Sequence, residues 1–160
     1  MANAAVRKHA PPPSWRAEVM DAQFTIGRRS GDAPAIEDAC RVGIMRRIAA
    51  ARLRCCGLQA LTDDVTLIVS ELLTNALLHS GTSEIRLKLT VEEGLLRIAV
   101  SDGVPSGMPP GPGPAGEDAE SGRGLILVAA LAQDQGGAFG ISDRGTTAWC
   151  TLALPPQEAS

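Results

Sequence analysis

Aromatic side chains are scarce in this sequence of 160 residues. It contains two Trp, two Phe and no Tyr, so it offers no platform on which the bases of single-stranded nucleic acid would stack. The formal net charge is −3, which gives no overall electrostatic attraction to nucleic acid or to an anionic membrane. We therefore expect no nucleic acid and no membrane among the partners, and a core built from Leu, Ile, Val and Ala.

Metal-binding patterns are missing as well. The four cysteines form no C-x-x-C pair and the histidines are His9 and His79 alone, so a structural zinc site is not expected. Cys40 and Cys150 fall on apolar faces of predicted elements, where cysteine acts as a small core residue.

Long hydrophobic runs and the common nucleotide motifs are absent too. The longest apolar run, residues 125–132, is far too short to span a bilayer, and residues 1–20 lack the apolar stretch of a secretion signal. There is no G-x-x-x-x-G-K-[ST] or G-x-G-x-x-G motif, and two histidines do not assemble a convincing Ser-His-Asp triad. The sequence therefore favours a cytoplasmic protein whose chemistry follows another pattern.

The length suits one domain with a substantial core. We expect a flexible arm rich in Ala and Pro over residues 1–19, a domain over 20–155 and a short tail over 156–160. Hydrophobic periodicity predicts, in order, a strand at 20–27, helices at 34–57 and 62–79, strands at 85–91 and 96–100, a short helix at 125–131, and strands at 136–142 and 146–154.

The first predicted helix is both apolar and basic. The residues predicted to line its buried side are Ile36, Cys40, Ile44, Ile48 and Ala51. Its five arginines, at positions 41, 46, 47, 52 and 54, lie mostly elsewhere and form either a solvated face or a docking surface for a partner. Gly57 is placed to cap the C-terminus of this helix, and Thr62 to cap the N-terminus of the next.

The second predicted helix carries a polar stripe. Glu71, Asn75 and His79 recur every fourth residue, so they share one face, and that face borders a broad apolar arc. A carboxylate and a carboxamide one turn apart suit the binding of a metal-bound phosphate and the orientation of a nucleophile. The alternative is a solvated stripe on an amphipathic helix, with His79 only a residue at the helix end.

Asp102 stands at the end of the predicted strand 96–100. Counting by two from Leu96, Ile98 and Val100 places its side chain on the apolar face of that strand. A carboxylate aimed between sheet and helices must find hydrogen-bond donors. It either caps a turn of the chain, for which Ser101-Asp102-Gly103 is suitable, or accepts a hydrogen bond from the amino group of a ligand.

A long Gly- and Pro-rich segment, residues 103–121, follows this strand. A stretch of this length without periodicity is typical of a lid or binding loop, and we expect bound nucleotide to order it. Gly122-Arg123-Gly124 comes next and is predicted to open the short helix. Glycines at a helix N-terminus leave backbone N–H groups accessible to an anion; the alternative is a junction that needs small residues for packing.

These pieces, in this order, resemble the GHKL ATPase/kinase superfamily, which includes gyrase, histidine kinases and heat-shock chaperones. Residues 71–76, Glu-Leu-Leu-Thr-Asn-Ala, resemble its N-box, residues 100–103, Val-Ser-Asp-Gly, its first glycine box, and residues 122–125, Gly-Arg-Gly-Leu, its second. Residues 145–149, Gly-Thr-Thr-Ala-Trp, and the small size are most similar to bacterial anti-sigma-factor serine/threonine kinases, notably those of actinomycetes. The similarity covers roughly residues 20–154.

The resemblance implies a fold and a role for each matching residue. The fold is an α/β (α+β) two-layer sandwich of the Bergerat type, with a mixed, mostly antiparallel sheet and helices on one face. Glu71 would be the general base, Asn75 would bind Mg²⁺ on the ATP phosphates, and Asp102 would accept from the adenine amino group. Gly122 and Gly124 would cradle phosphates. Further residues expected to contact the nucleotide are His79, Gly103, Arg123, Leu125 and, through its hydroxyl next to adenine, Thr147. The sequence departs from the family pattern in lacking a clean D-x-G-x-G after Val100 and in its Pro-rich lid.

The function implied by the resemblance is that of an anti-sigma factor with ATP-dependent protein serine/threonine kinase activity. Its expected partners are a sigma factor and an anti-anti-sigma protein of the STAS type, and a homodimer is an open alternative to a monomer. A non-catalytic module that uses ATP only as a structural ligand while it sequesters a regulatory partner is the alternative function. ATP hydrolysis coupled to movement is less favoured, because the sequence shows no transducer domain.

Overall fold

The protein is seen here as a computed structural model that describes residues 16–26, 36–79, 84–102, 119–142 and 146–156, with backbone alone for residues 79 and 119–122. The elements are β1 (Ala17–Thr25), α1 (Ile36–Cys55), the short 3₁₀ helix η1 (Gln59–Leu61), α2 (Thr62–His79), β2 (Glu84–Glu92), β3 (Leu95–Ser101), α3 (Ala119–Asp134), β4 (Phe139–Ser142) and β5 (Thr147–Ala153).

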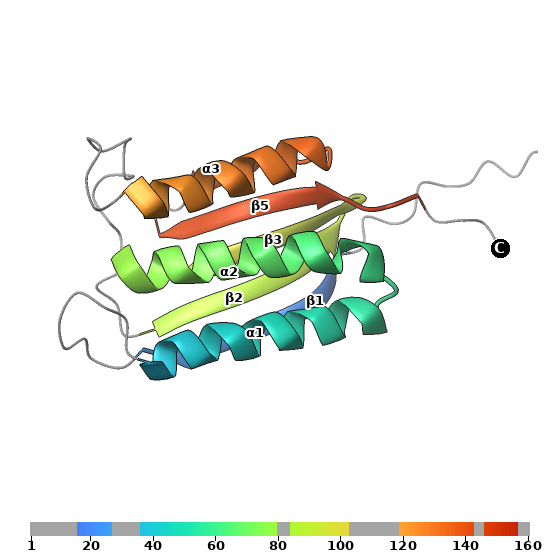
Figure 1. Ribbon diagram of the computed structural model, residues 1–160. Coiled ribbons are helices and arrows are strands. Elements are labelled where there is room, and N and C mark those ends of the chain that lie inside the picture. The colour runs from blue at the N-terminus through green and yellow to red at the C-terminus, as the bar shows by residue number, and fades with distance from the viewer. Residues whose placement is uncertain (1–15, 27–35, 80–83, 103–118, 143–145, 157–160) are drawn as a thin grey trace, which may run out of the picture.

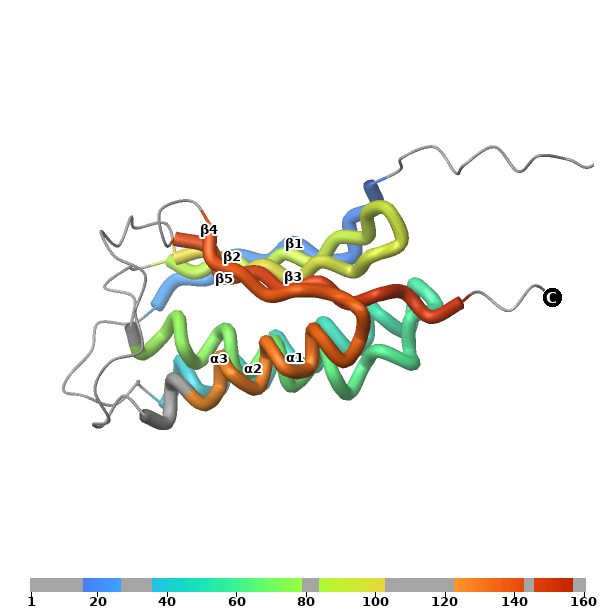
Figure 2. The backbone as a smooth tube through the Cα atoms, turned by 90° about the horizontal axis from the view of Figure 1, so that it is seen from above, coloured from blue at the N-terminus to red at the C-terminus, as the bar shows by residue number. Residues whose placement is uncertain are grey.

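Two layers make up the fold (Figures 1 and 2). The five described strands form one sheet in the order β1-β2-β3-β5-β4, and every neighbouring pair is antiparallel. The helices α1, α2 and α3 lie side by side on one face of this sheet, with α2 in the middle (Figure 1). The predicted two-layer sandwich is therefore confirmed, and its sheet is fully antiparallel among the described strands.

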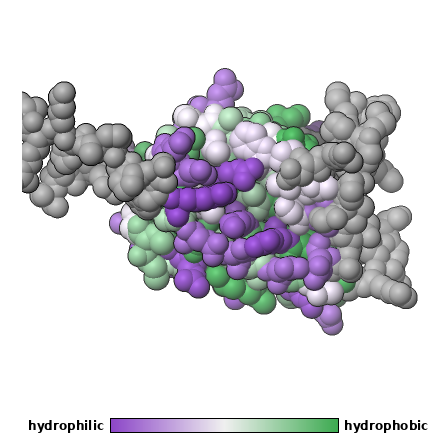
Figure 3. Space-filling view, turned by 180° about the vertical axis from the view of Figure 1, so that it is seen from behind, coloured by the Kyte–Doolittle hydropathy of each residue, from purple (hydrophilic) through white to green (hydrophobic). Residues whose placement is uncertain are grey.

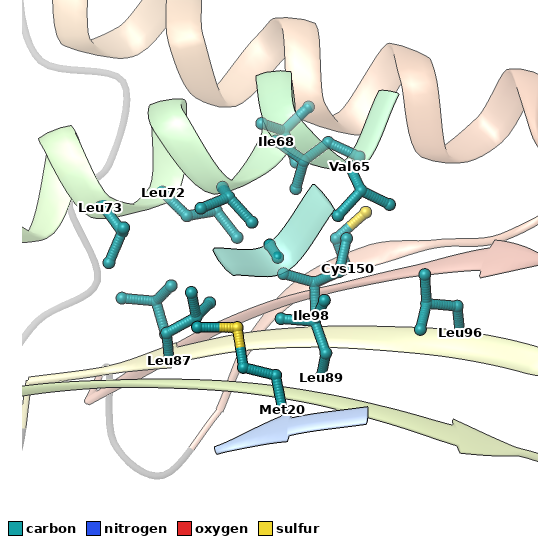
Figure 4. Packing of buried hydrophobic residues seen from close by; sticks show 14 of the residues in the cluster. Met20, Val65, Ile68, Leu72, Leu73, Leu87, Leu89, Leu96, Ile98 and Cys150 are labelled. Carbon is teal, nitrogen blue, oxygen red and sulfur yellow. The ribbon is translucent and has the colours of Figure 1, made fainter. Parts of the chain in front are cut away.

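The core lies between α2 and the central strands (Figure 4). Ile68, Leu72 and Leu73 of α2 point toward Leu87 on β2 and Ile98 on β3, and all five side chains are buried. Burial of one such aliphatic side chain contributes about 1.5–3 kcal/mol. The alternation predicted for β2 and β3 is confirmed, since their apolar positions face the helices.

Cys150 is a core residue, as predicted. Its side chain is fully buried on β5 among the aliphatic core residues. Burial raises the pKa of this thiol to about 12, so it stays protonated and acts as a small apolar side chain.

The buried face of α1 is not the predicted one. Its buried apolar residues are Val42, Ala49 and Leu53, whereas Ile36 is 84% exposed and Ile44 46% exposed. The remaining members of the predicted face, Cys40, Ile48 and Ala51, are exposed as well. The prediction was wrong because α1 has two apolar faces, and periodicity does not tell which of them packs on the sheet.

The junction between α1 and α2 corrects one capping prediction and confirms the other. Gly57 has φ of 73°, and the N–H of Leu58 donates to the carbonyl of Leu53 at 2.8 Å, which is the geometry of a glycine C-cap. Thr62 is already helical, because η1 runs directly into α2, and so it does not act as an N-cap. Its buried hydroxyl has no hydrogen-bond partner among the described residues.

Two element boundaries also differ from prediction. β1 begins at Ala17, so residues 17–19 belong to the sheet and not to the predicted arm over 1–19. Residues 1–15 lie outside the described part. The third helix, α3, begins at Ala119, well before the predicted start.

The face of the sheet opposite the helices is largely hydrophilic (Figure 3). There Arg86 donates to both carboxylate oxygens of Asp21, from Nε at 2.7 Å and from Nη2, and Lys88 lies 3.5 Å from Glu18. The Arg97 guanidinium stacks 5.6 Å from the centre of the Trp149 ring. The apolar surface is therefore concentrated between the layers and on the helices.

Candidate functional site

Four elements that carry the predicted site residues meet at one end of the molecule (Figure 1). The C-terminal half of α2, the end of β3, the beginning of α3 and the beginning of β5 all lie on the left of that view. This arrangement follows from the topology, because β3 ends where the antiparallel β5 begins. The fold therefore gathers the polar stripe of α2, Asp102, the glycines of α3 and the Thr146-Thr147 pair at one end.

Glu71 and Gly124 are in direct contact across the α2–α3 boundary. A Cβ atom built on Gly124 would lie 2.2 Å from Oε2 of Glu71 and 3.2 Å from its Cδ. The carboxylate therefore occupies the space that any side chain at position 124 would need. Glycine at this position lets the Glu71 carboxylate lie against the backbone of α3, and this contact joins two predicted site residues that are far apart in the sequence.

Asn75 lies one turn after Glu71, and both side chains are half-buried. The residues that flank them on α2, Leu72, Ala76 and Leu77, are buried in the core. The predicted polar stripe at the border of an apolar arc is therefore confirmed for Glu71 and Asn75. His79 is the last residue of α2, and its side chain lies outside the described part.

Asp102 directly follows β3 and extends its pairing with β5 by one residue. Its N–H donates to the carbonyl of Thr146 at 3.0 Å. Since Val100 is buried on the helix-facing side, the continued register places Asp102 on the same side, as predicted. Asp102 as a whole residue is half-buried, and Gly103 lies outside the described residues.

Thr147 faces the other side of the sheet. It pairs with Ser101, its hydroxyl is 2.8 Å from the Ser101 hydroxyl, and its side chain is buried. Ala148 and Cys150 point toward the helices, so the intervening positions 147 and 149 point away from them. The predicted adenine contact through the Thr147 hydroxyl therefore does not fit the geometry.

Thr146 is a further candidate site residue, which the sequence motifs do not single out. It lies opposite Asp102, one residue before Thr147, and so falls on the helix-facing side of the sheet. The signal was present in the sequence, because counting back by two from Cys150 and Ala148 leads to Thr146.

The glycines of α3 do not open the helix. The N–H groups without helical partners in an α-helix are those of the N-cap and the first three helical residues, and α3 starts at Ala119, so Gly122 and Gly124 both lie beyond that group. Gly124 therefore matters for the side chain that it lacks, and neither glycine falls among the free amides at the start of α3. Arg123 is exposed and Leu125 is half-buried. Of the predicted lid, 119–121 belong to α3 and 103–118 lie outside the described residues.

The comparison with protein families gives a match over most of the chain. The profile of the histidine kinase-like ATPase domain matches residues 36–152, which covers α1 through most of β5. The chain belongs to the histidine kinase-like ATPase family. The comparison with curated proteins found no match.

Membership in the histidine kinase-like ATPase family makes this an ATP-binding domain of kinase-like type. The pieces 71–76, 100–103 and 122–125 fall inside the matched range. One observation fits the metal ion of an anionic nucleotide: on α2, an Asn carboxamide lies one turn from a carboxylate. Within the described residues no three His, Cys, Asp or Glu side chains cluster as a metal site, and none of the helices there is long and apolar enough to cross a bilayer.

Proposed function

We propose that this ATP-binding domain is a protein serine/threonine kinase that acts as an anti-sigma factor. In this proposal it sequesters a sigma factor and phosphorylates a serine of an anti-anti-sigma protein of the STAS type, in the cytoplasm and as a homodimer. The observation that carries the kinase part is the Glu71 carboxylate against Gly124, with Asn75 one turn away on the same helix.

Glu71 suits the role of a general base. It is half-buried against the second turn of α3, at the end of the molecule where the other predicted site residues gather. Its carboxylate would accept the proton of a partner's serine hydroxyl as that oxygen attacks the γ-phosphate. Gly124 allows the carboxylate to take this position, because a side chain at residue 124 would collide with it.

Asn75 would hold the metal ion through its side-chain oxygen. The described residues offer no cluster of carboxylates for this purpose, so Mg²⁺ would take its other ligands from the phosphates of ATP and from water. When bound, the ion neutralises charge on the phosphates. This assigns Asn75 to nucleotide binding and Glu71 to the transfer step.

Asp102 would recognise adenine by accepting a hydrogen bond from its amino group. Its half-buried position on the helix-facing side supports this role. We assign the accompanying hydroxyl to Thr146 in place of Thr147, because Thr146 lies opposite Asp102. A charge-assisted hydrogen bond of this kind contributes about 1.5–3 kcal/mol.

Two variants on α2 test the proposal. Asn75→Ala should weaken Mg-ATP binding measured by calorimetry, whereas Glu71→Ala should keep most of the affinity and lose about 10²–10⁴-fold in the rate of transfer from γ-labelled ATP to a STAS-type protein. Thr74→Ala is the matched control, because this side chain is exposed on the same turn.

The alternative, a module that uses ATP only as a structural ligand, predicts a different result. In that case the wild type binds ATP, phosphorylates no candidate partner, and does not differ from Glu71→Ala in γ-phosphate transfer. That outcome would remove the kinase assignment and leave the ATP-binding domain.

A further inference from the structure

The side of α1 that faces away from the core carries an apolar stripe. Cys40, Ile44, Ile48, Ala51 and Cys55 are all exposed, with Ile44 at 46% and Ile48 at 37%. Their spacing of three or four residues puts them in one row along the helix. The row is ~22 Å long at 1.5 Å per residue. We call these five residues the α1 stripe.

Arginines border the α1 stripe on both sides. Arg47 and Arg54 follow Ile44 and Ala51 by three residues, and Arg52 follows Ile48 by four, so each lies next to a stripe residue on the helix surface. All three arginines are exposed, and no carboxylate of the described residues pairs with them.

Acidic residues on α1 do little to balance this charge. Of the two, Asp38 is buried and lies 3.6 Å from Arg41, which leaves Glu37 as the exposed carboxylate of the helix. The outer face of α1 is thus basic on a chain whose formal net charge is −3.

We propose that the α1 stripe is a docking surface for an amphipathic helix with acidic flanks on a partner protein. A row of apolar residues spaced by three and four fits the apolar row of a second helix, and unpaired arginines on both sides fit carboxylates beside that row. This surface is distinct from the nucleotide site, and the proposal does not depend on kinase activity.

Two other occupants fit less well. A second copy that docks α1 on α1 would bring its own unpaired arginines against these, and like charges across an interface are unfavourable. An anionic membrane also attracts arginine-flanked apolar helices. However, the α1 stripe has no aromatic anchor and its opposite face is already buried in the core, while the chain as a whole is negatively charged.

A pair of synthetic peptides provides the probe. Each is a stapled amphipathic helix of about 18 residues with a Leu row, flanked in one peptide by Glu and in the other by Lys at the same positions. In fluorescence anisotropy the Glu peptide should bind at least tenfold more tightly than the Lys peptide. It should also slow alkylation of Cys40 by iodoacetamide at least tenfold, as read by mass spectrometry. The buried Cys150 thiol should stay unreacted and so report that the protein remains folded.

Variants locate the binding surface. Ile44→Ser with Ile48→Ser should weaken binding of the Glu peptide tenfold or more, whereas Ile126→Ser, at a 70% exposed isoleucine on α3, should leave it unchanged. Arg47→Glu with Arg54→Glu should reverse the preference in favour of the Lys peptide. ATP affinity should be unaffected in all of these variants, which separates this test from that of the kinase.

Each contrary result assigns the surface differently. Equal binding of the two peptides, or unprotected Cys40, overturns the proposal. If the protein binds phosphatidylglycerol vesicles, if the double variant Ile44→Ser with Ile48→Ser abolishes that binding, and if the two peptides bind equally, the surface binds a membrane and the proposal is overturned. If sedimentation shows concentration-dependent dimers and the same double variant abolishes them, the surface binds a second copy of this chain and the proposal is overturned.

Discussion

Gly124→Ala separates the structural role of position 124 from its role in the site. The new Cβ would lie 2.2 Å from Oε2 of Glu71, while its distance to the Glu71 Cβ would be an ordinary 3.8 Å. The conflict is therefore with the far end of a flexible side chain, and rotation of Glu71 relieves it without movement of either helix. The carboxylate oxygen must retreat by roughly 1.2 Å to reach an ordinary contact of 3.4 Å.

The expected effects on stability and on activity have opposite signs. Alanine is more favourable than glycine inside a helix by up to about 1 kcal/mol, so the free energy of unfolding should stay equal or rise. A displacement of about 1 Å in a catalytic group costs on the order of 10²-fold in rate, so γ-phosphate transfer should fall by about that factor. ATP affinity should change much less than the rate.

Gly43→Ala on α1 is the matched control, because a Cβ there would meet nothing nearer than Arg46 Nη2 at 3.9 Å. It should gain similar stability in urea denaturation and keep full transfer from labelled ATP. The double variant Gly124→Ala with Glu71→Ala should be no slower than Glu71→Ala alone, since both changes act on one carboxylate. A folded Gly124→Ala protein with wild-type transfer activity would refute the assignment of Glu71 as the base.

Three further predictions concern stability and the nucleotide pocket. Thr62→Val removes a buried hydroxyl without a partner and should raise the free energy of unfolding by about 1 kcal/mol in urea denaturation; a decrease would show that the hydroxyl is satisfied. The hydrogen bond from Arg86 lowers the pKa of Asp21 from its usual value of 3.8. The wild type should therefore be more stable than Asp21→Asn at neutral pH, and this difference in the free energy of unfolding should disappear as the pH falls below 3.8 through the lowered pKa. A difference that does not depend on pH would contradict this. Thr146→Val should weaken ATP binding roughly two- to tenfold in calorimetry, whereas Thr147→Val should mainly lower the free energy of unfolding. The reverse pattern would return Thr147 to the nucleotide site.

The central helix and the central strands could be predicted from the sequence because their patterns have a single interpretation. On α2, the apolar arc and the stripe of Glu71 and Asn75 leave one way to pack the helix on a sheet. On β3, alternation extends through Val100 to Asp102 and places the carboxylate on the inner side.

The errors arose where the sequence admits two interpretations. α1 has apolar residues on both sides, and the choice of Val42 and Leu53 as buried depends on the shape of the neighbouring elements. The start of α3 lies in a segment without hydrophobic periodicity, so the sequence predicts the glycines as its first residues, whereas the helix begins at Ala119. The contact of Glu71 with Gly124 joins two segments far apart in the chain, and no local pattern encodes it.

The most direct test of the ATP site is the choice between ATP and GTP at Asp102. The carboxylate accepts from the amino group of adenine, whereas guanine presents a carbonyl oxygen at the same position and would meet a second acceptor. Calorimetric titration of the wild type should show ATP bound ten- to hundredfold more tightly than GTP, from a charge-assisted hydrogen bond of about 1.5–3 kcal/mol. Asp102→Asn, whose amide can donate to the guanine oxygen, should lose ATP affinity by a similar factor and narrow the difference between the two nucleotides. Equal ATP affinities for the wild type and Asp102→Asn, or no preference of the wild type for ATP over GTP, would contradict the placement of adenine at this end of the sheet.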